Sequence, residues 1–175
     1  MISICEFTAD LAETRIEELS ELLIDAVDSG ASIGFMPPLS VEAARDYWRS
    51  VIDAIRHHSR VLLVAEEDGL IQGSVQLGLE LRANGNHRAE AMKLFVHRRA
   101  RRKGLARRLM GEVETVARRL GLTLLLMDTR KEGDAEKLCG LLGYVRYGEV
   151  PGYARSSNGE LHTTVFFYRQ LSFDQ

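Results

Sequence analysis

Cysteine, proline and long apolar runs are scarce in this chain. Its 175 residues include two cysteines and three prolines. Cys5 and Cys139 stand 134 positions apart, so they cannot form the disulfide framework of a small secreted domain. No run approaches the roughly 18 apolar residues of a transmembrane helix, and residues 1–10 lack the basic start and apolar stretch of a signal peptide. We therefore expect one globular domain over residues 1–175, cytoplasmic and without membrane association.

Sequence motifs for metals and nucleotides are also absent. The chain has no CxxC or HExxH motif, and its five histidines are scattered without ligand spacing. It lacks both the GxxxxGK(S/T) motif of P-loops and the GxGxxG motif of dinucleotide folds. These absences predict that no metal is bound and that neither common nucleotide loop is used.

Positive charge is concentrated in one short segment. Residues 98–108 hold seven basic residues and no acidic one, whereas the rest of the chain has a net charge of −9 against −2 overall. Such a patch usually meets an anion, although a solvated helix start with nothing bound is a simpler alternative. The acidic remainder would repel a polyanion, so we expect no nucleic-acid partner. A compact diphosphate explains why the charge is confined to one turn.

Hydrophobic periodicity predicts a mixed α/β domain. Helical spacing covers residues 10–29, 40–55, 101–121 and 135–142, with Asp10 and Ser40 as N-caps. Strand patterns cover residues 60–66, 70–81, 88–97, 122–128, 144–149 and 163–171. The run at 122–128 is continuously apolar, which is typical of a strand buried on both faces. We predict a mixed, mostly antiparallel sheet of about six to seven strands flanked by about four helices.

The basic segment ends in a turn suited to phosphate. Gly104 and Ala106 are small, so the backbone there can turn tightly and approach a ligand. The first N–H groups of the following helix have no partner within the helix and lie at its positive end. Such a helix start binds phosphate.

The spacing of residues 101–106 fits Arg/Gln-x-x-Gly-x-Gly/Ala, and it resembles the coenzyme A pyrophosphate loop of GNAT acetyltransferases. The order of the predicted elements matches the GNAT order over the full chain. Residues 30–36, 86–96, 128–129 and 148–171 are further similar to the tabtoxin-resistance acetyltransferase subfamily. The resemblance implies a GNAT fold and direct acetyl transfer, in a ternary complex, from acetyl-CoA to a primary amine of a small molecule, such as an amino-acid-like toxin or metabolite.

The resemblance also assigns the cofactor site. The main chain of Leu94, Phe95 and Val96 would pair with the pantetheine arm and polarise the acetyl carbonyl. Backbone amides of one loop would hold the pyrophosphate, with two of its side chains in reach of the 3′-phosphate. The loop consists of Arg101, Arg102, Lys103, Gly104, Leu105, Ala106 and Arg107, and the two side chains are Arg102 and Lys103.

The catalytic and acceptor residues follow from the same resemblance. Asp128 is the leading candidate for the base, with Glu90 as the alternative. GNAT enzymes commonly place a tyrosine acid where this chain has Cys139, so Cys139, Tyr144 or water would protonate the leaving thiolate. The acceptor side would be lined by Gly34, Phe35, Met36, Asp128 and Tyr153.

Two other functions stay open from the sequence. Loss of the usual tyrosine is compatible with a catalytically weak GNAT-like protein that only binds acyl-CoA. A nucleic-acid-binding module using residues 98–108 is the less favoured alternative. The final strand could also pair across a homodimer, as it does in many GNAT folds.

Overall fold

The computed structural model, which describes residues 2–172, places seven strands in one sheet in the order β1-β2-β3-β4-β5-β7-β6. Strands β4 and β5 are parallel, and every other neighbouring pair is antiparallel. This confirms the predicted mixed, mostly antiparallel sheet. The strands are β1 (Ile2–Phe7), β2 (Arg60–Glu67), β3 (Leu70–Leu79), β4 (Arg88–Val96), β5 (Leu124–Arg130), β6 (Val145–Arg155) and β7 (Leu161–Gln170).

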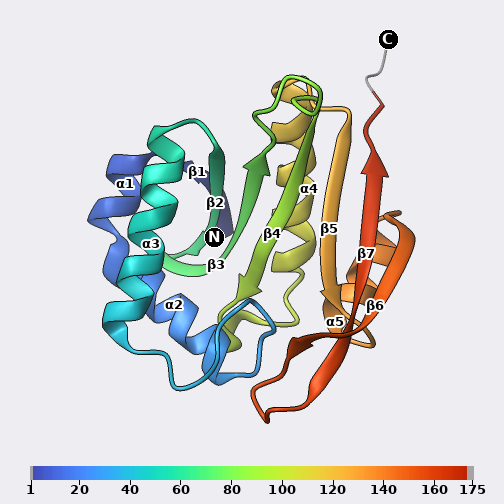
Figure 1. The fold of residues 1–175 in the computed structure, drawn as a ribbon. Helices are drawn as coiled ribbons and strands as arrows, with labels where there is room; N and C mark the ends of the chain where they lie inside the picture. Colours follow the sequence, from blue (N-terminus) through green and yellow to red (C-terminus); the bar gives the residue numbers. More distant parts are fainter. Residues whose placement is uncertain (1, 173–175) are drawn as a thin grey trace.

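Helices cover both faces of this sheet (Figure 1). The first three helices pack on one face, where their sheet contacts fall on β1 to β4. Helix α4 packs on the other face against β2, β3 and β4, and α5 packs beside it on β5. The helices are α1 (Ala9–Thr14), α2 (Ile16–Asp28), α3 (Val41–Arg56), the 3₁₀ turn η1 (Arg98–Ala100), α4 (Leu105–Arg119) and α5 (Asp134–Leu141). Within residues 2–172, no helix has the length and apolarity needed to cross a membrane.

The amino-terminal region differs from the sequence prediction. A strand, β1, precedes the first helix, and Thr8 caps that helix by accepting from the Leu11 N–H; the expected cap was Asp10. The long first helix is broken at Arg15, whose guanidinium bonds to Glu66 and to the Gly69 carbonyl. These long-range bonds are tertiary, so local spacing could not reveal the break.

The parallel strands β4 and β5 pair over a short stretch only. Their register links residues 88–90 to residues 124–126. Beyond it the two strands separate toward their carboxyl ends (Figure 1). We call the separated segments, residues 91–96 of β4 and 127–130 of β5, the fork. Along the fork, the edge of β4 that faces β5 has no strand partner within the described chain.

Strand β5 is buried on one face, and the expectation of burial on both faces was wrong. Leu125 and Met127 are buried in the cluster under α4 and α5, whereas Leu126 is half-buried and Asp128 is exposed. The reason is the placement of α1, α2 and α3, whose sheet contacts end at β4. The fork therefore has one covered face and one open face, and Asp128 lies on the open face.

Candidate functional site

The turn before α4 is built from unusual backbone conformations. Arg102 (φ +61°) and Gly104 (φ +77°) both adopt the left-handed region, and Gly104 caps α4 without any side-chain hydrogen bond. The first helical bond runs from the Arg108 N–H to the Gly104 carbonyl at 3.1 Å. Among the hydrogen bonds of the described residues, none is donated by the backbone N–H groups of residues 101–107. These free amides lie at the positive end of a helix of 15 residues, an arrangement that suits an anion.

Most basic side chains around this turn have partners within the protein. Arg101 donates to the Val96 carbonyl and to Ser29, and Lys103 lies 3.3 Å from a Glu67 oxygen. Arg98 forms an ion pair with Asp25. Arg99 donates to the Gln72 side chain and to the Ile71 carbonyl, and Arg108 donates to the Ile2 carbonyl. In the described part of the chain, the side chains of Arg102 and Arg107 have neither a hydrogen bond nor an ion pair. These two side chains are thus the ones available to an anion.

Strand β4 carries a bulge at the fork. Its register against β3 shifts between the pairs Ser74–Phe95 and Gln76–Met92, and Lys93 has a left-handed φ of +55°. Phe95 is buried against Trp48 at a ring distance of 6.4 Å, and Leu94 and Val96 pack partly against the core. The side chains therefore serve packing. Their main chain is what remains available to a ligand.

Two carboxylates occupy the open face of the sheet. Glu90 is paired with Leu126, and Asp128 follows two residues later, so alternation puts both acids on one face. Both are exposed, and neither forms an ion pair within residues 2–172. Partial loss of hydration raises the pKa of both, and the negative charge of Asp128 raises the pKa of Glu90 further. The Lys93 ammonium opposes both increases.

An aromatic cluster adjoins the carboxylates. Phe166 of β7 is the cross-strand partner of Asp128. Tyr153 meets the Phe166 ring edge-on at 5.3 Å, and Tyr147 lies 6.1 Å from both Phe166 and Tyr168. Tyr147 and Tyr153 are more than half exposed. The predicted acceptor residue Tyr153 is therefore brought close to Asp128 through Phe166.

The loop between α2 and α3 reaches the same region. Phe35 packs edge-on against Tyr47 at 5.1 Å, and Met36 is exposed. His162 links this loop to the β6–β7 hairpin, because its two ring nitrogens lie 3.1 Å from the Ser32 hydroxyl and 3.0 Å from the Ser156 hydroxyl. Loss of hydration, followed by the Arg130 charge, lowers the pKa of His162. The predicted acceptor loop is thus tied to the strands that carry the aromatic cluster.

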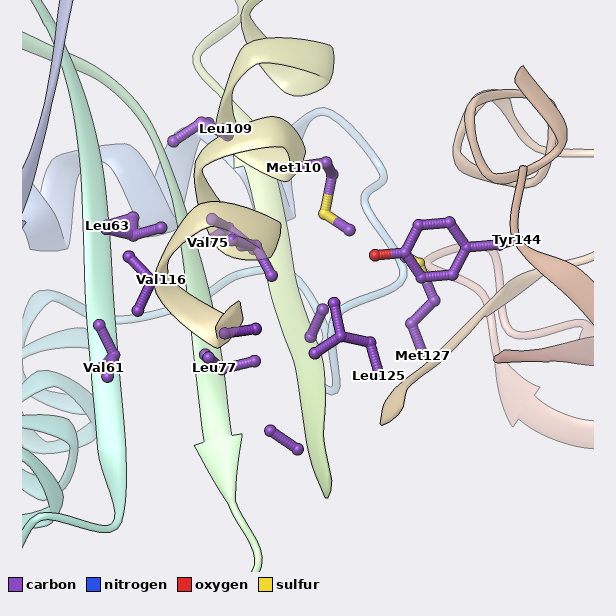
Figure 2. Packing of buried hydrophobic residues seen from close by; sticks show 14 of the residues in the cluster. Val61, Leu63, Val75, Leu77, Leu109, Met110, Val116, Leu125, Met127 and Tyr144 are labelled. Carbon is purple, nitrogen blue, oxygen red and sulfur yellow. The ribbon is translucent and has the colours of Figure 1, made fainter. Parts of the chain in front are cut away.

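Cys139 and Tyr144 lie in the core on the covered face. The Cys139 thiol is 1% exposed and sits 3.4 Å from the Met127 sulfur, and burial raises its pKa to about 12. Tyr144 is also buried, and its hydroxyl points into the core cluster (Figure 2). Burial, and then the Glu114 charge, raises the pKa of Tyr144. An acid role for either remains a prediction, and their surroundings favour packing.

Four polar residues near the carboxylates were missed at the level of sequence. The Gln76 side chain accepts from Arg60 and donates to the Tyr47 hydroxyl, each at 2.8 Å, and the Arg60 charge lowers the pKa of Glu90. The fourth is Lys93, at the bulge. For Gln76 and Lys93 the available signal was a polar side chain inside a strand that otherwise reads as apolar. Within residues 2–172, no group of three or more His, Cys, Asp or Glu side chains is placed to hold a metal ion.

Comparison with known proteins places this arrangement in a family. The model of the acetyltransferase (GNAT) family matches residues 24–144, which is well over half of the chain. An uncharacterised N-acetyltransferase from Azospirillum brasilense is 36% identical over 118 residues, which cover 66% of this chain and 68% of that protein. The chain belongs to the GNAT acetyltransferase family.

Solved structures agree on the fold. A putative acetyltransferase, yncA, of Salmonella typhimurium, whose structure contains its cofactor acetyl-CoA, superimposes with a TM-score of 0.78 at 20% identity, covering 98% of this chain and 94% of that one. An N-acetyltransferase from Staphylococcus aureus superimposes with a TM-score of 0.80 at 17% identity, covering 98% and 99%. At these identities the likeness shows the fold alone.

The residues of the turn before α4 fit the cofactor that this family uses. A pyrophosphate needs several inward-facing N–H donors, and the amides of residues 101–107 are free to provide them. A Cβ added at Gly104 would meet nothing within 4 Å, so space over the turn is open. The partnerless edge of β4 offers main-chain groups to an extended arm.

Proposed function

We propose that this protein transfers the acetyl group of acetyl-CoA to a primary amine of a small molecule. The observation that carries the proposal is the combination, near the carboxyl ends of β4 and β5, of a free-amide turn and two carboxylates that form no ion pair within residues 2–172. The turn suits a diphosphate, and the carboxylates suit an amine that must lose a proton. When bound, acetyl-CoA supplies the acetyl group and the electrophilic carbonyl carbon.

The turn and strand β4 share the binding of the cofactor. Backbone amides of residues 101–107 hold the pyrophosphate, and Arg102 and Arg107 add charge to it. Main-chain groups of residues 94–96 bind the arm and orient the acetyl carbonyl. Lys103 contributes less, because Glu67 already occupies its ammonium.

The two carboxylates on the open face of the sheet handle the proton of the amine. Asp128 or Glu90 accepts that proton while the nitrogen bonds to the carbonyl carbon and the carbon–sulfur bond breaks. The sulfur then takes up one proton, so the products are an N-acetylated amine and coenzyme A. The raised pKa of each carboxyl makes it a better base than an ordinary surface carboxylate.

The acceptor binds between the aromatic cluster and the loop with Gly34, Phe35 and Met36. Two carboxylates and exposed tyrosine rings suit a cationic amine with an apolar body. Similarity of residues 30–36 and 148–171 to the tabtoxin-resistance subfamily supports an amino-acid-like acceptor. Tyr153 is the side chain that we expect to touch it.

Binding and turnover test the proposal separately. Saturating acetyl-CoA should raise the melting temperature, and Gly104→Glu should abolish that shift, because a non-glycine residue at φ +77° is strained and its charge repels a phosphate. Gly111→Glu, where an added Cβ also meets nothing within 4 Å, is the matched control and should keep the shift. Release of free thiol, followed against a panel of primary amines, reports turnover. No shift at saturating cofactor would refute the proposal.

A second function is favoured by one observation. The two candidate acids, Cys139 and Tyr144, are buried on the covered face, whereas Asp128 lies on the open face. A fold that binds acyl-CoA without efficient transfer would have this arrangement. A clear melting shift with no thiol release from a broad amine panel would establish it.

A further inference from the structure

We propose that Lys93 is a positioning residue of the acceptor site: its ammonium group fixes the loop of residues 31–36 against strand β4, beside the carboxylates of Glu90 and Asp128. The inference rests on the proposed function, since it takes this loop and these carboxylates as the acceptor side. It concerns a residue for which neither charge pattern nor motif in the sequence gave a role.

The bulge in β4 determines where the Lys93 side chain goes. The register of β4 against β3 slips between Phe95 and Met92, and Lys93 takes the left-handed conformation at the slip. A non-glycine residue pays a conformational cost in that region, so the surrounding contacts must favour it. A regular strand would present this side chain at another angle. The bulge therefore sets the direction of the Lys93 side chain.

The ammonium of Lys93 makes two contacts with one short loop. It donates a hydrogen bond to the Ile33 carbonyl and lies 5.7 Å from the centre of the Phe35 ring. Between them, a Cβ added at Gly34 would stand 3.0 Å from the Lys93 nitrogen. Gly34 also has a left-handed φ of +88°. The loop backbone thus turns closely over the ammonium, and the absence of a side chain at Gly34 permits it.

The same ammonium lies in a cluster of charged side chains. Its charged and titratable neighbours are Asp128 from β5, Glu90 from β4 and Arg60 from β2. Loss of hydration lowers the pKa of Lys93, and the two carboxylates counteract this. In return, the Lys93 charge lowers the pKa of both carboxyls. Loop position and carboxyl basicity are therefore controlled by one group.

Hydrogen exchange tests the positioning of the loop without any turnover. Lys93→Met should make the amides of residues 31–36 exchange roughly tenfold faster, the loss expected for one charge-assisted hydrogen bond. Lys137→Met, which removes a largely exposed lysine on α5 near Asp134, is the matched control and should leave this loop unchanged. Gly34→Ala should speed the exchange as well, because its methyl group would crowd the ammonium while the charge is kept.

Titration of the side-chain carboxyls by carbon NMR tests the charge. Lys93→Met should raise the titration midpoints of Asp128 and Glu90, whereas Lys93→Arg and Gly34→Ala should leave them near those of the wild type. A purely structural lysine would not change these titration midpoints.

Unchanged loop exchange together with unchanged midpoints in Lys93→Met would overturn the proposal. If that variant does not fold, Gly34→Ala decides for the loop: wild-type exchange of residues 31–36 would then overturn it. All these readouts are obtained on the free protein, so failure of acetyl transfer would not be confused with failure of this inference.

Discussion

Phe166 of β7 lies directly opposite Asp128 of β5 in the antiparallel register. This pairing sets an acid beside an aromatic cluster on the one half of the sheet that α1, α2 and α3 leave open. An amine seated there would contact rings on one side and carboxylates on the other. Asp128 is therefore well placed both to orient an acceptor and to deprotonate it.

Replacing the two carboxylates one at a time should identify the base. We expect Asp128→Asn to lower kcat by roughly 10²- to 10⁴-fold, the usual contribution of general base catalysis, and Glu90→Gln to have a smaller effect. Steady-state kinetics with the amine identified from the panel measures both. Asp53→Asn, which removes an exposed surface acid whose ion pair is with Arg56, is the control and should keep the wild-type rate. A larger loss of kcat in Glu90→Gln than in Asp128→Asn would identify Glu90 as the base.

The raised pKa of Asp128 also predicts a pH-dependent effect on stability. A carboxyl whose pKa is higher in the folded state binds more protons there than in the unfolded state, so its contribution to stability falls as pH rises between the two values. Asp128→Asn removes this penalty. The variant should therefore melt at a higher temperature than the wild type at neutral pH and show no such advantage below the ordinary carboxyl pKa. Calorimetry across that range checks the sign, and an equal difference at every pH would contradict it.

The sequence predicted most of the fold because most elements have a strong local signal. Ser40 caps α3 as expected, and its hydroxyl accepts from the Ala43 N–H at 3.1 Å. A tight turn at Gly104 was likewise expected, and Gly104 is left-handed at the start of α4. The features that escaped prediction depend on long-range contacts. The break at Arg15 needs Glu66, and the aim of Lys93 needs a bulge that no residue pattern encodes.

The site residues also divide into those that the sequence could indicate and those that depend on tertiary packing. Asp128 and Glu90 could be picked out from the resemblance to GNAT enzymes, and the register then brought them to one face. Burial could not be read from the sequence. Cys139 was placed correctly on a short helix, but the face of that helix that meets Met127 is determined by how α5 packs on β5.

Arg102 and Arg107 should matter more for coenzyme A than Lys103 does. The two arginines have no partner within residues 2–172, whereas the Lys103 ammonium lies 3.3 Å from Glu67. Loss of one charge-assisted hydrogen bond costs about 1.5–3 kcal/mol, so Arg102→Met and Arg107→Met should each raise the Kd for coenzyme A by roughly tenfold or more. Lys103→Met should raise it several-fold less. Calorimetric titration at two salt concentrations checks this, and equal effects of all three would show that only total charge counts.

Tyr144→Phe separates packing from acid catalysis. The Tyr144 hydroxyl is buried and has no hydrogen-bond partner within the described chain, so it carries a desolvation cost with nothing to offset it. Removing the oxygen should raise the free energy of unfolding by about 1 kcal/mol and leave kcat near the wild-type value, with water protonating the sulfur.

Cys139→Ala should also keep kcat, but it should lower stability, because it opens a small cavity beside Met127. Denaturant unfolding and steady-state rates measure both effects. A large fall in kcat for Tyr144→Phe, without a loss of stability, would instead make this phenol the acid and require it to reach the fork when substrates are bound.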